Sequence, residues 1–122
     1  MFAPHYKIDN LVAIVDHNGL QIDGPISEVC DPGDLGAKFE VFGWKVYRVD
    51  GHDIDALIET LKAAKADRNG KPHMIIADTI KGKGVSFMEN QVNWHGVAPK
   101  GEQLEQALAE LEAAAAKEAH RG

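Results

Sequence analysis

The sequence predicts a three-layer α/β sandwich with a mainly parallel sheet. Three short apolar runs, at residues 11–15, 44–49 and 74–77, have the length and composition of buried strands. Segments with helical spacing separate these runs, and parallel strands require such crossover connections. The alternation of strand and helix therefore indicates a sheet with helices on both faces.

The first half of the chain predicts two of the strands and the first full helix. Residues 1–10 are expected to form a short helical segment and a loop, and residues 11–15 a strand buried on both faces. Residues 25–32 are expected to be irregular, with a turn at 31–34. Asp34 is a suitable N-cap for a helix over residues 35–42, which Gly43 would end.

The second half continues the same alternation. After the strand at 44–49, residues 50–53 form a tight polar turn, and Asp53 caps a helix whose apolar face is Ile54, Leu57, Ile58 and Leu61. Residues 73–79 contain the third strand, and Lys81-Gly82-Lys83-Gly84 is expected to be a flexible connection. A last helix from Glu102 has an apolar stripe and a glutamate face expected to be solvated; the stripe is Leu104, Leu108 and Leu111, and the face is Glu102, Glu105, Glu110 and Glu112.

Composition excludes several classes of protein. The chain has 122 residues, a net charge of −6 and 44% hydrophobic residues, enough for one small domain with a core. The negative charge argues against nucleic acid as a partner, because phosphate backbones require a basic face. No apolar run approaches the roughly 20 residues needed to cross a membrane, and no secretory signal is recognisable. The single cysteine, Cys30, excludes an intrachain disulfide, and a cytoplasmic location is expected.

The polar segment Asp16-His17-Asn18-Gly19-Leu20-Gln21-Ile22-Asp23-Gly24 is the first candidate site. It follows a predicted parallel strand, and ligands of open α/β sheets bind at the carboxyl ends of the strands. The Asn18 amide oxygen is a hard ligand suited to Mg²⁺ or Ca²⁺, and Gly19 permits a sharp turn that exposes the Leu20 carbonyl. On spacing alone, an ordinary turn explains the same residues, because Asp, Asn and Gly are common turn formers.

This segment resembles the second half of the thiamine diphosphate motif of transketolases, where an Asp-Asn-Gly element is soon followed by Ile-Asp-Gly. The matching residues here are Asn18-Gly19 and Ile22-Asp23-Gly24. Residues 33–43, 46–51, 75–84 and 94–99 also look like the pyrophosphate-binding domain of this family. The likeness is greatest to the separately encoded N-terminal section of split bacterial transketolases.

The resemblance implies thiamine diphosphate and Mg²⁺ (or Ca²⁺) as cofactors, and sugar phosphates as substrates. Metal binding would fall to Asn18 and the Leu20 carbonyl. In transketolases, a His-Gly shortly before Ala-Pro contacts the diphosphate and the sugar, and His95 occupies that place in Trp94-His95-Gly96-Val97-Ala98-Pro99. His95 is therefore the candidate catalytic residue, with Trp94 as a packing anchor. The implied cofactor-binding residues are Asn18, Gly19, Leu20, Ile22, Ile80 and His95.

One departure from the family pattern affects the functional prediction. The family motif opens with Gly-Asp-Gly, whose aspartate binds the metal, and none precedes Asn18. Residues 1–122 are therefore expected to be a partial pyrophosphate-binding domain that binds the cofactor weakly or not detectably. Activity would require a complementary subunit with the family's pyrimidine domain. A homodimer is also expected, with Met1, Phe2, Tyr6 and residues 11–15 as its contact surface.

Two other interpretations stay open. The chain can instead be a truncated, catalytically silent α/β module that self-associates through its uncovered apolar surface. The sequence also does not separate a transketolase of the pentose phosphate pathway from deoxyxylulose-phosphate synthase, because the substrate pockets lie largely elsewhere. Catalytic competence with added cofactor distinguishes the enzyme part from the silent module.

Overall fold

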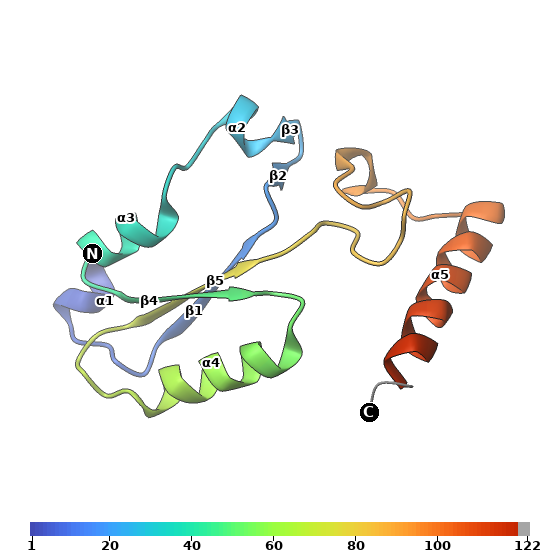
Figure 1. Ribbon diagram of the computed structural model, residues 1–122. Helices are drawn as coiled ribbons and strands as arrows, with labels where there is room; N and C mark the ends of the chain where they lie inside the picture. Colours follow the sequence, from blue (N-terminus) through green and yellow to red (C-terminus); the bar gives the residue numbers. More distant parts are fainter. Residues whose placement is uncertain (120–122) are drawn as a thin grey trace. The chain divides into compact units, whose positions relative to one another are not determined.

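The computed structural model describes residues 1–119. The chain forms two compact units, which we describe separately (Figure 1). The first comprises Met1–Asn18 and Asp31–Thr79, and the second comprises Gly19–Cys30 and the chain from Ile80 onward. No helix among the described residues is both long enough and apolar enough to span a bilayer.

The first unit contains a three-stranded parallel sheet, as the sequence predicts. Its strands are β1 (Val12–His17), β4 (Lys45–Asp50) and β5 (His73–Asp78), in the order β1-β5-β4. Both pairings are parallel, with His73 opposite Val12 on one side and opposite Lys45 on the other. The last strand in sequence is thus the central strand of the sheet.

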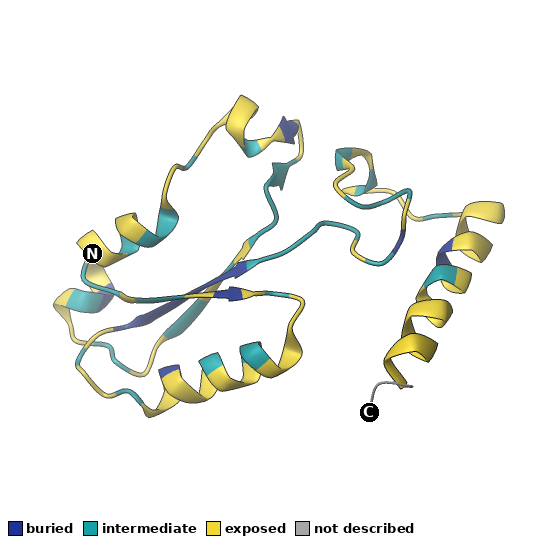
Figure 2. Cartoon of the chain, viewed as in Figure 1, coloured by how far each residue is buried: buried dark blue, intermediate teal, exposed yellow. Residues whose placement is uncertain are grey.

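The central strand β5 forms most of the core. Five of its six residues are buried, and Figure 2 shows this strand as the most buried part of the sheet. Ile75 and Ala77 pack with Val49 of β4 in the main apolar cluster. Burial on both faces explains why the apolar run of β5 is continuous rather than alternating.

Strand β1 differs from its prediction. It begins and ends later than residues 11–15, and it lies at the edge of the sheet rather than between two strands. None of its residues is fully buried, and Ile14 is 58% exposed. The expectation of a strand buried on both faces is therefore wrong for β1, because helices α3 and α4 pack mainly over β4 and leave the faces of the edge strand partly open.

Helices cover both faces of the sheet. Helix α3 (Leu35–Val41) lies over Val46 and Ile76, because a Cβ at Gly36 would be 3.7 Å and 3.6 Å from these two side chains. Helix α4 (Ile54–Ala66) packs its Leu57 against the core cluster on the other face. This arrangement confirms the three-layer prediction, and the short helix α1 (Phe2–His5) precedes β1.

The two predicted N-caps are confirmed. The Asp34 carboxylate accepts a hydrogen bond from the Ala37 amide at 3.1 Å, and the Asp53 carboxylate accepts one from the Ala56 amide at 2.9 Å. Such bonds satisfy amides that have no partner within the helix. These contacts are local in sequence, which is why the sequence predicts them well.

The second unit contains a hairpin and two short helical turns that the sequence does not reveal, together with the helix from Glu102 that it predicts. Strands β2 (Leu20–Gln21) and β3 (Gly24–Pro25) form a small antiparallel hairpin. Helix α2 (Ile26–Val29) follows, where an irregular loop is expected. A 3₁₀ turn, η1 (Val92–Trp94), and the long helix α5 (Glu102–Ala119) complete the unit.

Candidate functional site

The carboxyl edge of the parallel sheet is where the predicted site begins. His17, Asp50 and Asp78 end the three strands in register with one another. The chain leaves the first unit directly after this edge, at Asn18 and again at Thr79. Ligands of open α/β proteins bind outside this edge, so its side chains form the first candidate site.

A polar cluster joins all three strands on one face of this edge. The Nδ1 atom of His17 lies 2.6 Å from Oδ1 of Asp78, and Nη1 of Arg48 lies 3.7 Å from Oδ2 of the same carboxylate. A carboxylate only accepts hydrogen bonds, so its partner Nδ1 carries the proton. When the ring is neutral, Nε2 of His17 is therefore the acceptor nitrogen.

A second cross-strand bond lies on the opposite face. The Thr79 hydroxyl donates to the Asp16 carboxylate, and the Thr79 amide donates to the His17 carbonyl at 3.2 Å. Consecutive strand residues point to opposite faces, so these bonds and the His17–Asp78 pair hold β1 to β5 from both sides. Asp16 is thus already engaged by a residue of its own unit.

Gly51 brings the β4–α4 turn close to the end of β5. Its amide donates to the Asp78 carbonyl at 2.8 Å. A Cβ atom at Gly51 would lie 3.1 Å from that carbonyl oxygen and 3.2 Å from the Ala77 Cβ, with the Thr79 methyl group closer still. The turn at 50–53 therefore sets the backbone at Thr79, from which the chain enters the second unit.

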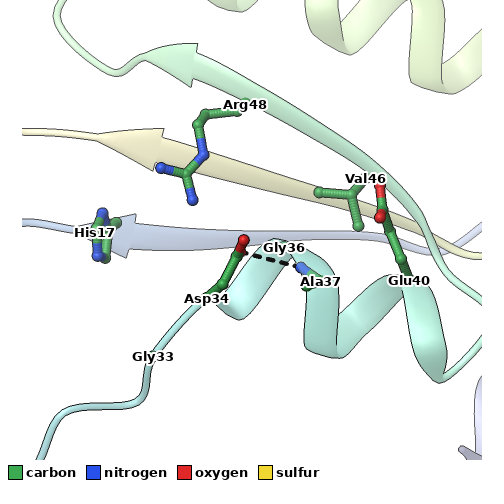
Figure 3. A pocket seen from close by; sticks show the side chains of 8 residues that line it. All are labelled: His17, Gly33, Asp34, Gly36, Ala37, Glu40, Val46 and Arg48. Atoms are coloured by element: carbon green, nitrogen blue, oxygen red, sulfur yellow. Dashed lines mark hydrogen bonds between the residues drawn. The ribbon is translucent and has the colours of Figure 1, made fainter.

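A cleft of about 540 Å³ opens beside this edge, between β4 and α3 (Figure 3). His17 and Arg48 line it from the sheet, and Asp34 and Glu40 line it from the segment around α3. The cleft thus combines an imidazole and a guanidinium with two carboxylates. His17 and Arg48 pair with Asp78, and Asp34 caps α3, so the lining of the cleft is mixed in charge.

Asn18 and Gly19, the first predicted site residues, lie at the junction of the two units. Asn18 is the last residue of the first unit before the hairpin, and Gly19 opens the second unit with φ of +73°. No atom lies within 4 Å of a Cβ built on Gly19. The Gly19 carbonyl accepts a hydrogen bond from the Ile26 amide at 3.0 Å, which holds the hairpin in place.

The other predicted site residues belong to the second unit. Leu20 lies in β2, and Ile22 at the hairpin turn is 65% exposed. Ile80 begins the next loop, and its carbonyl accepts from the Lys83 amide at 3.2 Å. His95 is exposed directly after η1. That these residues together bind one cofactor stays a prediction, because their individual positions do not test it.

Trp94 is a packing anchor, as predicted. Its ring centroid lies 5.3 Å from that of Phe87, and its indole Nε1 donates to the Phe87 carbonyl at 3.0 Å. Residues 81–84, expected to be a flexible connection, adopt a turn conformation, and their flexibility stays a prediction. Gly82 and Gly84 have φ of +73° and +92°, and the Lys81 carbonyl accepts from the Asn90 amide at 2.9 Å, so this connection is a closed turn.

Sequence reasoning missed Arg48, Asp78 and Thr79 as members of the edge cluster. Asp78 and Thr79 follow the third apolar run directly, so their position past a predicted strand is a usable signal. Arg48 has no such signal, because it lies inside a strand. Across residues 1–119, no group of three or more His, Cys, Asp or Glu side chains is arranged to hold a metal ion.

Comparison with known proteins identifies close relatives. Residues 1–118 match the family model described as transketolase, thiamine diphosphate binding domain. The chain is 43% identical over 109 residues to one of the subunits of the apulose-4-phosphate transketolase of Actinobacillus succinogenes. It is 41% identical over 112 residues to 6-deoxy-6-sulfo-D-fructose transketolase subunit SqwG of a Clostridium species. These matches cover 89% and 92% of this chain, but only 39% and 40% of the two relatives.

Solved structures agree with the sequence comparison. Transketolase from Leishmania mexicana superposes with a TM-score of 0.81 at 30% identity, over 89% of this chain and 16% of that one. Transketolase from Campylobacter jejuni gives a TM-score of 0.80 at 30% identity, over 87% of this chain and 16% of that one. The matched fold is therefore one section of a much longer enzyme chain.

Proposed function

Because the chain belongs to the transketolase family of thiamine diphosphate-binding domains, we propose that it supplies the diphosphate-binding face of a thiamine diphosphate-dependent transketolase. The observation that carries the proposal is the position of Asn18-Gly19 directly past the carboxyl end of the parallel strand β1. This is the expected place for a ligand in such a sheet. In this proposal, residues 1–122 are part of a pyrophosphate-binding domain.

We assign metal binding to the Asn18 amide oxygen and the Leu20 carbonyl. Gly19 supports this assignment, because its positive φ turns the backbone and its own carbonyl is bonded to Ile26. Both proposed ligands are neutral oxygen donors of the kind that Mg²⁺ and Ca²⁺ accept. Mg²⁺ takes six ligands, so two neutral donors from this chain form only part of its coordination shell.

We assign binding of the cofactor's diphosphate and of the substrate hydroxyl to His95. An exposed imidazole can donate a hydrogen bond to a phosphate oxygen near neutral pH. Ile22 and Ile80 would supply apolar contacts to the thiamine rings. Bound thiamine diphosphate would supply the nucleophile for moving a two-carbon ketol unit between sugar phosphates, and the protein would orient it.

We propose that activity needs a complementary subunit. The two bacterial relatives are themselves named as transketolase subunits, and this chain spans only about two fifths of their length. The pyrimidine-binding domain would belong to the complementary partner. Catalysis would thus require more than this chain.

Self-association without catalysis is the second candidate function. Its support is an exposed apolar surface on α1 and the residues that flank it: Met1, Phe2 and Tyr6 are 81%, 70% and 61% exposed. Surfaces of this kind favour association in water. A closed two-fold dimer is the commonest outcome for such chains.

Calorimetric titration with thiamine diphosphate and Mg²⁺ tests the proposal. We expect weak binding that depends on Mg²⁺ and is further weakened by Asn18→Ala, because this removes one of two metal ligands. Asn93→Ala is the matched control, since it removes an exposed asparagine amide from the second unit. Submicromolar affinity would contradict the proposal that this chain supplies only two neutral ligands to Mg²⁺. Another carboxylate, such as that of Asp16, would then have to bind the metal. No binding at millimolar cofactor would favour the silent module.

A further inference from the structure

Residues 80–95 form a loop that is closed by its own hydrogen bonds. The Asn90 amide donates to the Lys81 carbonyl at 2.9 Å. A Cβ at Gly82 would lie 2.5 Å from the Met88 carbonyl oxygen, so the two arms of the loop are in close contact. These contacts join residues 81–82 to residues 88–90 and close the first part of the loop.

Helix α5 holds this loop mainly through the Glu110 carboxylate, and Gln106 adds a longer bond to the Ser86 hydroxyl at 3.4 Å. Glu110 Oε2 accepts from the Ser86 amide at 2.6 Å, and Glu110 Oε1 accepts from the Ser86 hydroxyl at 2.7 Å. The Gln106 amide donates to the same Oε1 at 2.7 Å. The expectation that Glu110 lies on a purely solvated face is therefore wrong, because its partner is 24 residues away along the chain.

Apolar packing accompanies these hydrogen bonds, since Val85 of the loop and Ala107 of α5 are both buried. Ala107 is the buried residue of α5, while Leu104, Leu108 and Leu111 are 44%, 51% and 45% exposed. The backbone of Gly84 lies close to Leu111, and a Cβ there would be 3.2 Å from its Cδ2. The hydrogen bonds of Glu110 to Ser86 are the shortest polar contacts between the helix and the loop.

The charge of Glu110 is stabilised at this position. The hydrogen bond from the Ser86 amide, followed by those from Gln106 and the Ser86 hydroxyl, lowers the pKa of the Glu110 carboxyl. A cavity of about 400 Å³ beside it is also lined by Glu89 and Lys117. Glu89 accepts from the Gly84 amide at 3.0 Å and pairs with Lys83 at 3.8 Å.

A continuous path leads from Ser86 to His95. Phe87 follows Ser86, and its carbonyl accepts the indole N–H of Trp94 at 3.0 Å. His95 follows Trp94, and its amide donates to the Val92 carbonyl at 3.0 Å. A displacement of Ser86 would therefore reach His95 through one side-chain hydrogen bond and one ring contact.

We propose that Glu110 is a positioning residue, whose carboxylate anchors Ser86 to α5 and thereby holds the loop that presents His95. The inference rests on the proposed function of His95 in binding the diphosphate. Glu110 itself touches neither cofactor nor substrate in this assignment. Its effect on binding is transmitted by the loop.

Glu110→Gln in the full chain is the direct test, in a Trp44→Phe background where Trp94 is the only indole. Glutamine has the same shape but is neutral and has one acceptor oxygen, so its bond from the Ser86 amide is no longer charge-assisted. If its amide nitrogen takes the place of Oε1, it can no longer accept from Gln106. We expect the indole N–H of Trp94 to exchange roughly tenfold faster, the effect of losing about one charge-assisted hydrogen bond. Glu112→Gln, on the same helix and also exposed, is the matched control and should leave the exchange rate unchanged.

The pH dependence separates the carboxylate from a general loss of stability. Because the pKa of Glu110 is lowered, its carboxylate stays charged and keeps its hydrogen bonds at any pH above the ordinary glutamate range. These bonds are lost only as the pH falls through the lowered pKa. Indole exchange, corrected for its intrinsic pH dependence, should therefore show a step below that range in the parent chain. The step should be absent in Glu110→Gln. Ser86→Thr keeps the hydroxyl and should retain the parent behaviour.

Affinity for thiamine diphosphate with Mg²⁺ completes the test. We expect Glu110→Gln to weaken it several-fold and Glu112→Gln to leave it unchanged. Unchanged indole exchange in Glu110→Gln would overturn the proposal, and so would faster exchange with unchanged affinity. If the parent chain binds no cofactor, the proposed function fails, and the exchange and its pH step alone decide whether Glu110 holds the loop.

Discussion

Gly51→Ala should destabilise the first unit through a steric conflict at the end of β5. A Cβ at this position would lie 3.1 Å from the Asp78 carbonyl oxygen and 3.2 Å from the Ala77 Cβ, and closest of all to the Thr79 methyl group. The φ of Gly51 is not in the left-handed region, so the conflict is purely one of space. Overpacking of this kind costs about 1–3 kcal/mol.

Part of this cost should be recoverable. Thr79→Ser removes the methyl group that meets the new Cβ and keeps the hydroxyl that donates to Asp16. We expect the double variant Gly51→Ala/Thr79→Ser to regain about half of the lost free energy of unfolding, because neighbouring sites couple by about 0.5–3 kcal/mol. The contacts at Asp78 and Ala77 remain tight, so recovery should be incomplete.

Urea unfolding followed by far-ultraviolet circular dichroism measures these changes. Gly96→Ala is the control, because no atom lies within 4 Å of a Cβ there and its φ is not positive. It should stay within about 0.5 kcal/mol of the parent chain. A Gly51→Ala variant as stable as the Gly96→Ala control would refute the close approach at β5. If the free-energy changes of Gly51→Ala and Thr79→Ser simply add in the double variant, the Thr79 methyl group is not what the new Cβ collides with.

Three further variants test other parts of the structure. Asp53→Ala removes the cap bond to the Ala56 amide, so thermal unfolding should show a loss of about 1 kcal/mol. His73→Leu should unfold at higher urea concentration, because neither ring nitrogen of this buried histidine has a hydrogen-bond partner. The polar contact that the replacement loses is the 3.6 Å approach of Nε2 to the Asp67 carboxylate, which is beyond hydrogen-bond distance. Phe2→Asp should weaken any dimer that buries the Phe2–Tyr6 ring pair, since an unpaired carboxylate is costly to bury. Light scattering measures this, and a parent chain that is monomeric at all concentrations would exclude that dimer.

The local structure of this chain follows from its sequence. Asp34 and Asp53 cap their helices by bonds to amides three residues away, and the apolar spacing within α4 is visible in a short window. The position of Asn18-Gly19 past a strand is equally local, and so is the family motif that these residues match. Neighbouring residues along the chain determine all of these features.

The tertiary structure alone decided which strand is central and which is at the edge. Strands β1 and β5 have similar apolar runs, yet β5 is buried and β1 is half-exposed, because β5 is central and the helices that cover the sheet pack over the β4 side, away from the edge strand β1. Hydrophobic composition reports a preference for burial, whereas burial itself depends on neighbours that lie far away along the chain.

Distant contacts likewise changed the interpretation of single residues. Glu110 matches a solvated helix face by composition, but Ser86, 24 residues earlier, donates two hydrogen bonds to it. Gly51 matches an ordinary turn, but the end of β5 leaves no room for a side chain there. His17 and Asp78 are 61 residues apart and meet only because their strands are adjacent and in register. Local patterns predict the elements of this protein, and the pairing of remote segments determines which side chains act together.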